Sequence, residues 1–317
     1  MSAQAGGSPI AKSFGRWFDN EAVDHTLGDT DRVDWLSVVP FVALHLACLA
    51  VWWVGFSPVA AQVALLLYLV RMFAITGFYH RYFAHRAFHA SRAVQFVFAV
   101  VGASAVQRGP LWWASHHRHH HLHADDEEDA HSPHRHGFLH AHALWFLKGK
   151  NFATRHEIVA DFARYPELRF LDRFDSVVPL LLAAGLYGLG AWLAAAHPGL
   201  GTNGWQMLVW GFCISTVVLY HATFTVNSLA HSVGRRRYAT RDRSRNNWWL
   251  AILTLGEGWH NNHHHFPGAA RQGFFWWEID LTYYGLRLLS VLGLVRDLRQ
   301  VPESMLYARA ALPEEKP

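Results

Sequence analysis

Residues 35–70 read WLSVVPFVALHLACLAVWWVGFSPVAAQVALLLYLV and contain no Asp, Glu, Lys or Arg. The run is interrupted only at residues 55–58, Gly-Phe-Ser-Pro, which is a typical turn signal. A helix needs about 20 apolar residues to cross the hydrocarbon core of a bilayer. The stretch therefore predicts two membrane-spanning helices, at residues 36–54 and 59–79, joined as a hairpin.

A second charge-free stretch has the same organisation. It runs from Ser176 to Val233, with a Pro- and Gly-rich turn at residues 198–204. We expect spans at residues 177–196 and 205–226. The composition agrees, because charged residues make up only 16% of the chain, against roughly 25% in an average soluble domain. The predicted fold is an all-α integral membrane protein with four transmembrane helices in two hairpins.

Arg71 and the segment at residues 87–106 also bear on the prediction of four spans. Arg71 lies within the second predicted span, and we expect its long side chain to reach the membrane interface. Residues 87–106 are apolar but carry Arg92, Gln95 and Gln107 near their ends, which favours an interfacial or buried helix over a fifth span.

The basic residues indicate which side of the membrane each segment faces. Neither hairpin turn contains Lys or Arg, so by the positive-inside rule we expect both termini and the central segment in the cytosol, at a bacterial inner membrane or its equivalent. The predicted units are a tail at 1–34, a main domain at 35–277 with a helical cap at 80–175 and 227–277, and a C-terminal segment at 278–317. Because the basic residues surround the apolar segments and do not form one face, nucleic acid is not an expected partner.

Histidine is unusually abundant, with 24 residues. Nine of them stand at ligand spacing: the two in HRYFAH at 80–85, the first and last two in HRHHH at 117–121, the one in NSLAH at 227–231 and the three in HNNHH at 260–264. In two of these groups the spacing i, i+3, i+4 places three imidazoles on one helix face, so that each triad could serve one metal ion. Imidazole without thiolate suits Zn, Cu, Fe or Ni. An all-histidine set large enough for two ions beside a membrane indicates redox chemistry with iron.

Other interpretations are open on this evidence. His-rich surface tracts often bind metal without a function. Intramembrane histidines such as His45 and His221 are more often packing residues than ligands. A membrane metal transporter would need ionisable groups along a pathway inside the spans, and the charge-free segments offer few.

The strings HRYFAH, WWASHHRHHH, VNSLAH and GEGWHNNHHHFP resemble, in order and in position relative to four spans, the membrane fatty-acyl desaturases of the stearoyl-CoA desaturase type. The resemblance covers residues 35–277. It implies a di-iron centre with Asn227 reaching one iron through water and with these histidine ligands: His80, His85, His117, His120, His121, His231, His260, His263 and His264. Partners that orient the imidazoles would be Asp129, Glu257 and Asn261. Near the bend of an acyl tunnel the resemblance places Gln107, Trp113, Thr223 and Phe224.

The resemblance also implies the reaction. It is an O2-dependent desaturation that introduces a cis double bond, at position 9 by the family default, into a saturated acyl chain on CoA, acyl carrier protein or phospholipid. The cofactors would be two iron ions (Fe2+/Fe3+), and the electrons would come from a separate ferredoxin, rubredoxin or cytochrome b5-like donor and its reductase. The alternatives are a di-iron hydroxylase of the same architecture and, further away, the His-rich metal transporter.

Two features bear on the head group that carries the acyl chain. Relatives that use acyl-CoA have an Arg-Asp pair just before the second motif, where Ser115 and His116 stand here. The arginine-rich run at residues 235–245 could bind a phosphate-bearing head group or the anionic surface of the lipid.

Overall fold

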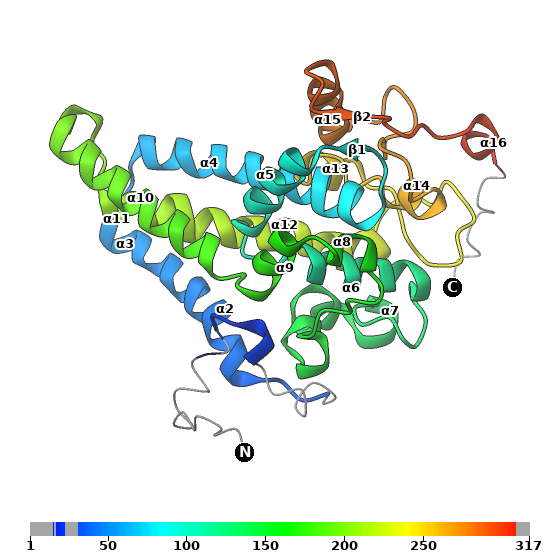
Figure 1. The fold of residues 1–317 in the computed structure, drawn as a ribbon, viewed down its shortest axis with the longest axis horizontal. Helices are drawn as coiled ribbons and strands as arrows, with labels where there is room; N and C mark the ends of the chain where they lie inside the picture. The colour runs from blue at the N-terminus through cyan, green and yellow to red at the C-terminus, as the bar shows by residue number, and fades with distance from the viewer. Residues whose placement is uncertain (1–14, 16, 23–30, 309–317) are drawn as a thin grey trace.

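The computed structural model describes residues 15, 17–22 and 31–308, and the chain is mostly helical (Figure 1). Within the described residues, four helices are long and apolar enough to cross a membrane: Trp35–Val54, Pro58–Ala84, Val177–Ala196 and Gly204–His231. The helix Val177–Ala196 has the same bounds as the predicted span at 177–196. The second and fourth helices continue past their predicted ends at 79 and 226. They therefore extend beyond the apolar segments into the region of the histidine motifs.

The four long helices consist of shorter elements with different hydrogen-bond patterns. In chain order these are α2 (Trp35–Ala47), η3 (Cys48–Ala50), α3 (Val51–Val54), α4 (Pro58–Phe73), the π-helix η4 (Ala74–Ala84), α10 (Val177–Ala196), α11 (Gly204–Gln206), the π-helix η9 (Met207–Ile214), α12 (Ser215–Ser228) and η10 (Leu229–His231). The break between α3 and α4 has a local cause. Gly55 adopts a φ of +72°, and the Ser57 side chain caps α4 by accepting from the backbone N–H of Ala60.

Contacts between the long helices define the two ends of the bundle. α4 packs against η9 and α12, and α10 packs against α11 and η9. Gln206 donates to the Val54 carbonyl and Trp210 to the Gly55 carbonyl, each at 3.0 Å. The turn after α3 consequently lies beside the start of the fourth helix, at the same end as the turn between α10 and α11. In Figure 1 the elements that carry the histidine motifs lie at the opposite end.

The other described elements form a region that we call the cap, apart from the short η1 (Asn20–Ala22) in the tail and η8 (Pro198–Leu200) in the turn after α10. The cap helices are α5 (Arg92–Ala103), α6 (Pro110–His123), α7 (Pro133–His136), η5 (His140–Leu144), η6 (Trp145–Leu147), η7 (Gly149–Asn151), α8 (Ala160–Ala163), α9 (Pro166–Arg173), α13 (Trp248–Leu253), α14 (His260–His265), α15 (Leu281–Val291) and α16 (Glu303–Leu306). Two short strands, β1 (His89–Ala90) and β2 (Val295–Arg296), pair antiparallel with His89 opposite Arg296. α5 is only 12 residues long, too short to span a bilayer, which agrees with the prediction for residues 87–106.

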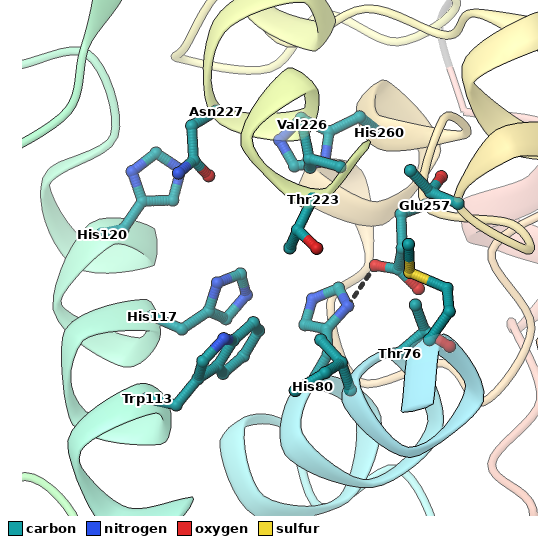
Figure 2. A pocket seen from close by; sticks show the side chains of 13 residues that line it. Thr76, His80, Trp113, His117, His120, Thr223, Val226, Asn227, Glu257 and His260 are labelled. Carbon is teal, nitrogen blue, oxygen red and sulfur yellow. Dashed lines mark ion pairs between the residues drawn. The ribbon is translucent and has the colours of Figure 1, made fainter. Parts of the chain in front are cut away.

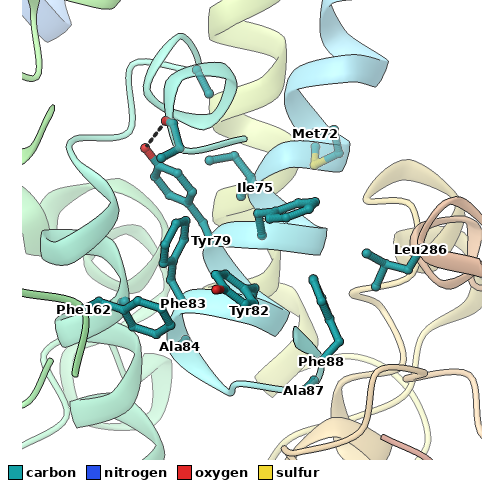
Figure 3. Packing of buried hydrophobic residues seen from close by; sticks show 14 of the residues in the cluster. Met72, Ile75, Tyr79, Tyr82, Phe83, Ala84, Ala87, Phe88, Phe162 and Leu286 are labelled. Carbon is teal, nitrogen blue, oxygen red and sulfur yellow. Dashed lines mark hydrogen bonds between the residues drawn. The ribbon is translucent and has the colours of Figure 1, made fainter. Parts of the chain in front are cut away.

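The main hydrophobic core surrounds η4, whose 11 residues are all buried (Figure 3). The rings of Phe78 and Phe98 stack with centroids 3.8 Å apart. Tyr79 packs directly on Gly102, where a Cβ would lie 2.2 Å from the tyrosine ring, and its hydroxyl donates to the Ala99 carbonyl. This packing against α5 fixes the segment that carries the first histidine motif.

Arg71 corrects one prediction. Its side chain does not extend to an interface, because only 1% of the residue is exposed. The guanidinium lies inside the bundle, where it donates to the hydroxyls of Ser215 and Thr216 on α12 and to the carbonyls of Leu67 and Ser104. These acceptors satisfy its donors, so Arg71 joins α4 to α12 and to the end of α5.

Candidate metal centre

The HRYFAH motif lies at the end of η4, and the π-helix explains its spacing. In a π-helix the N–H of residue i+5 bonds to the carbonyl of residue i, and His85 N–H donates to the His80 carbonyl at 3.2 Å. Residues five apart are therefore neighbours along one face. The His80 and His85 rings are 5.0 Å apart.

The two HxxHH motifs lie on α6 and α14. Four residues turn an α-helix about 40° past a full revolution, whereas three stop about 60° short of it. On α6 the first and last imidazoles, His117 and His121, accordingly lie together with ring centroids 4.7 Å apart. On α14, His260 and His264 do the same at 4.4 Å. The middle imidazole of each motif joins the other group, so the expectation that one triad serves one metal ion is wrong.

The nine predicted histidines form two adjacent groups, and within each group the ligand nitrogens all lie within 4.8 Å of one another. We call them cluster A and cluster B. Cluster A consists of His80, His85, His117, His121 and His263, and cluster B of His120, His231, His260 and His264. The clusters meet where the rings of His121 and His264 stack with centroids 4.4 Å apart.

Carboxylates orient four of the nine imidazoles by accepting a hydrogen bond from Nδ1. The pairs are His80 with Glu257, His120 with Asp129, His231 with Asp125, and His264 with Asp242. In the last three pairs the nitrogen–oxygen distance is 3.0–3.1 Å. With the proton on Nδ1, Nε2 keeps its lone pair for a metal ion.

Burial and these carboxylates set the protonation of the site. Desolvation, strengthened by neighbouring imidazoles, holds the pKa of five histidines well below its usual range: His85, His117, His121, His260 and His263. Burial would also lower the pKa of His120, but the Asp129 carboxylate raises it overall. Burial alone would raise the pKa values of the four carboxyl groups, yet their histidine partners lower them. Neutral imidazoles and ionised carboxylates are the forms that metal binding requires.

This donor set fits metal ions. Nε2 of His264 is buried and has no hydrogen-bond partner among the described residues. The Nε2 atoms of His80 and His263 face each other at 3.0 Å, although the Nδ1 proton of His80 points to Glu257. Two nitrogens this close can bind the same metal ion, since each metal–nitrogen bond is about 2.0–2.1 Å long. Glu257 is paired with Arg81, but the other three carboxylates around the clusters are costly to bury without compensating positive charge, which two divalent ions would supply.

A cavity lies beside both clusters, and Figure 2 shows its lining. Imidazoles of cluster A (His80, His117) and cluster B (His120, His260) form one part of the wall, and apolar side chains including Met72, Ile75 and Val226 form another. Asn227 also lines the cavity and is labelled in Figure 2. The cavity thus joins an apolar space to both groups of nitrogens.

Only two of the four predicted tunnel residues line the cavity. Trp113 and Thr223 line the cavity, and Trp113 stacks on His117 with centroids 5.0 Å apart. Gln107 lies one contact further away and donates to the Thr223 hydroxyl at 2.9 Å. Phe224 packs against Tyr220 on another side of α12.

Asn261, Ser115 and His116 each form hydrogen bonds with other segments of the protein. The side-chain oxygen of Asn261 accepts from the backbone N–H groups of Arg237 and Tyr238, so this residue holds the 237–238 segment and not an imidazole. Ser115 and His116, which replace the Arg-Asp pair, are buried. They tie α6 to residues 153–155, through the Arg155 N–H and the Ala153 carbonyl.

Sequence reasoning missed Asp125 and Asp242. Asp125 lies in the acidic run that follows the second motif, and Asp242 lies inside the arginine-rich run, where it resembles a surface charge. Asp125 accepts hydrogen bonds from His231, Ser132 and the backbone N–H of Arg243. An acidic residue isolated among arginines was the only available signal for Asp242.

Comparisons with known proteins agree with this site. The family model described as "Fatty acid desaturase" matches residues 52–287. The chain is 35% identical over 284 residues to an sn-2 palmitoyl-lipid 9-desaturase of Nostoc sp. (strain 36), covering 87% of this chain and 93% of that protein. It is 37% identical over 278 residues to delta-9 acyl-lipid desaturase 1 of Arabidopsis thaliana, covering 86% of each. It is 38% identical over 273 residues to an acyl-CoA 5-desaturase of Anemone leveillei, covering 85% of this chain and 80% of that protein.

Four long apolar helices, two histidine clusters able to bind metal, and a family match over most of the chain lead to one assignment. The relatives named above act on acyl groups of lipids or CoA. The chain belongs to the fatty acid desaturase family, as an integral membrane oxidoreductase that acts on acyl lipids.

Proposed function

We propose that this protein is an O2-dependent di-iron desaturase that places a cis double bond at position 9 of a saturated acyl chain carried by a lipid or by CoA. Cluster A would hold one iron and cluster B the other, with Asn227 acting on an iron through water. The position of the bond follows the relatives whose names give a 9-desaturase. Residues 35–277 would form the desaturase domain, between the tail at 1–34 and the C-terminal segment at 278–317.

The observation that carries the proposal is the cavity shared by the two clusters. It combines imidazoles of both with apolar side chains, and the described residues that line it include no Lys, Arg or Asp and a single Glu, Glu257, which is engaged by His80 and Arg81. An apolar chain is positioned in such a space by shape. We place one carbon–carbon bond of the substrate beside Trp113 and Thr223, on the side that faces the histidines.

The division of labour follows from this geometry. When bound, the two irons supply the activation of O2 and the removal of hydrogen from two neighbouring methylene carbons, which no acid or base of the protein could achieve. The carboxylates hold the imidazoles so that Nε2 points inward. The apolar wall of Met72, Ile75 and Val226, of which the first two are fully buried, would exclude water from the reacting carbons.

The orientation in the membrane is part of the proposal. Both inter-helix turns lack Lys and Arg and lie at one end of the bundle, whereas the clusters lie at the other. The positive-inside rule then puts the clusters and both termini in the cytosol. A ferredoxin, rubredoxin or cytochrome b5-like protein with its reductase would deliver electrons there.

The test is the fatty-acid profile of a desaturase-deficient host that expresses the protein or its His263→Ala variant, together with a competent electron donor. Mass spectrometry should find a new unsaturated chain, with its double bond at position 9, only with the intact protein. Analysis of the lipid and CoA pools over time would identify the carrier on which the bond first forms. Hydroxy-acyl products would identify a hydroxylase instead, and an unchanged profile would refute the proposal.

A further inference from the structure

The outer face of α6 carries a second set of possible ligands, separate from clusters A and B. His119 and His123 are spaced i, i+4, and their rings lie 4.6 Å apart. Glu128, from the loop that follows α6, places a carboxylate oxygen 3.5 Å from Nε2 of His123 and 4.0 Å from Nε2 of His119. In a tetrahedral zinc site the ligand atoms are roughly 3.3–3.6 Å apart, given metal–ligand bonds of about 2.0–2.2 Å. A small movement of one side chain would produce this arrangement.

Asp126 orients one of these imidazoles in advance. Its Oδ2 lies 3.1 Å from Nδ1 of His123, and its Oδ1 accepts from the backbone N–H of Glu128 at 2.7 Å. With its Nδ1 proton directed to Asp126, His123 presents the lone pair of Nε2 to Glu128. This is the carboxylate–histidine arrangement that accompanies metal ligands in proteins.

The three ligands are also accessible. The side chains of His119, His123 and Glu128 are 17%, 28% and 68% exposed. An ion can therefore reach them without passing through the cavity of clusters A and B.

The loop at residues 124–129 links this outer set to the metal centre. Asp125 and Asp129 point inward and orient His231 and His120 of cluster B. Asp126 and Glu128 point outward to the two histidines on the surface of α6. An ion that binds Glu128 and both surface histidines would fasten this loop to the helix that supplies three of the clustered imidazoles.

We propose that His119, His123 and Glu128 form a third metal site, which takes a divalent transition ion such as Zn2+ and clamps the 124–129 loop to α6. Two imidazoles and one carboxylate are a donor set that zinc uses in proteins. The clamp makes a bound ion stabilise the positions of Asp125 and Asp129. Iron in cluster B should consequently be released more slowly when the outer site is filled.

Binding is tested by titrating the iron-loaded, detergent-solubilised full chain with Zn2+ in a calorimeter, with iron measured before and after. We expect one zinc equivalent without loss of iron. His119→Ala and His123→Ala should remove it, and Asp126→Asn should weaken it by about 10- to 100-fold. His197→Ala, at an exposed histidine in the turn after α10 and at the other end of the bundle, should bind as the parent does. The proposed site would be refuted if both alanine variants bind zinc as the parent does, or if zinc binds only as iron is released.

The clamp has its own measurement. The rate at which a strong chelator removes iron should fall several-fold when Zn2+ is present at a concentration that fills the outer site. The same addition should leave the rate unchanged in His119→Ala, whose iron content and desaturation without zinc should equal those of the parent. Equal rates with and without zinc in the parent would refute the clamp. Because these readouts are zinc stoichiometry and iron release, they are independent of whether the reaction is desaturation or hydroxylation.

Discussion

Replacing Glu257 by Gln tests whether a carboxylate is needed to orient cluster A. Glu257 accepts from Nδ1 of His80 and, at 3.1 Å, from the guanidinium of Arg81. An amide has only one oxygen, so in either orientation its NH2 group faces one of these two donors. Glu257→Gln therefore keeps the shape of the side chain but cannot satisfy both His80 and Arg81.

The magnitude follows from these contacts. Loss of a carboxylate that orients a metal-ligating histidine weakens metal binding by about 10- to 100-fold, or about 1.4 to 2.7 kcal/mol. Breaking a buried ion pair costs about 3 to 5 kcal/mol of stability. We expect the lower end of this range of stability loss, because Arg81 keeps the Asp280 carboxylate at 3.0 Å and the Ala270 carbonyl at 2.8 Å.

The assay is iron per chain over a series of chelator concentrations, with the thermal unfolding midpoint of each protein measured in parallel. The matched control is Glu278→Gln, because Glu278 is another fully buried carboxylate in an ion pair, but its contacts are with Arg237 and Asn262 and not with an imidazole. Glu278→Gln should lower stability and leave iron affinity unchanged. The reasoning would be refuted if Glu257→Gln bound iron as tightly as the parent does, or if Glu278→Gln lost as much iron affinity as Glu257→Gln.

Three further predictions concern packing, pH and cluster B. Gly102→Ala should lower stability by about 1 to 3 kcal/mol, because the new Cβ would lie 2.2 Å from the Tyr79 ring. Gly188→Ala is the control and should not lower stability, because a Cβ there would have no neighbour within 4 Å. Equal unfolding midpoints for the two variants would contradict this prediction. In the metal-free protein, the pKa values of the buried cluster A imidazoles are lowered, so below about pH 6.5 only the unfolded chain takes up their protons. The thermal unfolding midpoint should therefore decrease as the pH is lowered from about 7 to about 5. A midpoint that stays constant over this range would contradict the lowered pKa values. Asp242→Asn should weaken one of two bound irons by about 10- to 100-fold, since His264 loses its orienting carboxylate; chelator titration should then show two unequal steps, and two unchanged sites would exclude this role.

Much of this protein follows from local patterns. Charge-free runs of sufficient length predict the membrane spans, since a bilayer penalises charge whatever the helix packs against. The structure has a helix with the same bounds as the span predicted at 177–196. Histidine spacing was equally informative. All nine imidazoles selected from the four motifs lie in clusters A and B, and for the six on α6 and α14 the spacing follows the helix period.

Tertiary packing decided the rest. The π-helical turn that brings His80 onto His85 depends on the aromatic core around η4 and leaves no mark in a five-residue spacing. The division of each HxxHH triad between two clusters depends on how α6 and α14 face each other. Asp125 and its partner His231 are 106 residues apart, so their pairing could not be read from local sequence. Periodicity is a property of a single element, whereas the orientation of a ligand is set by contacts between elements that only the folded chain brings together.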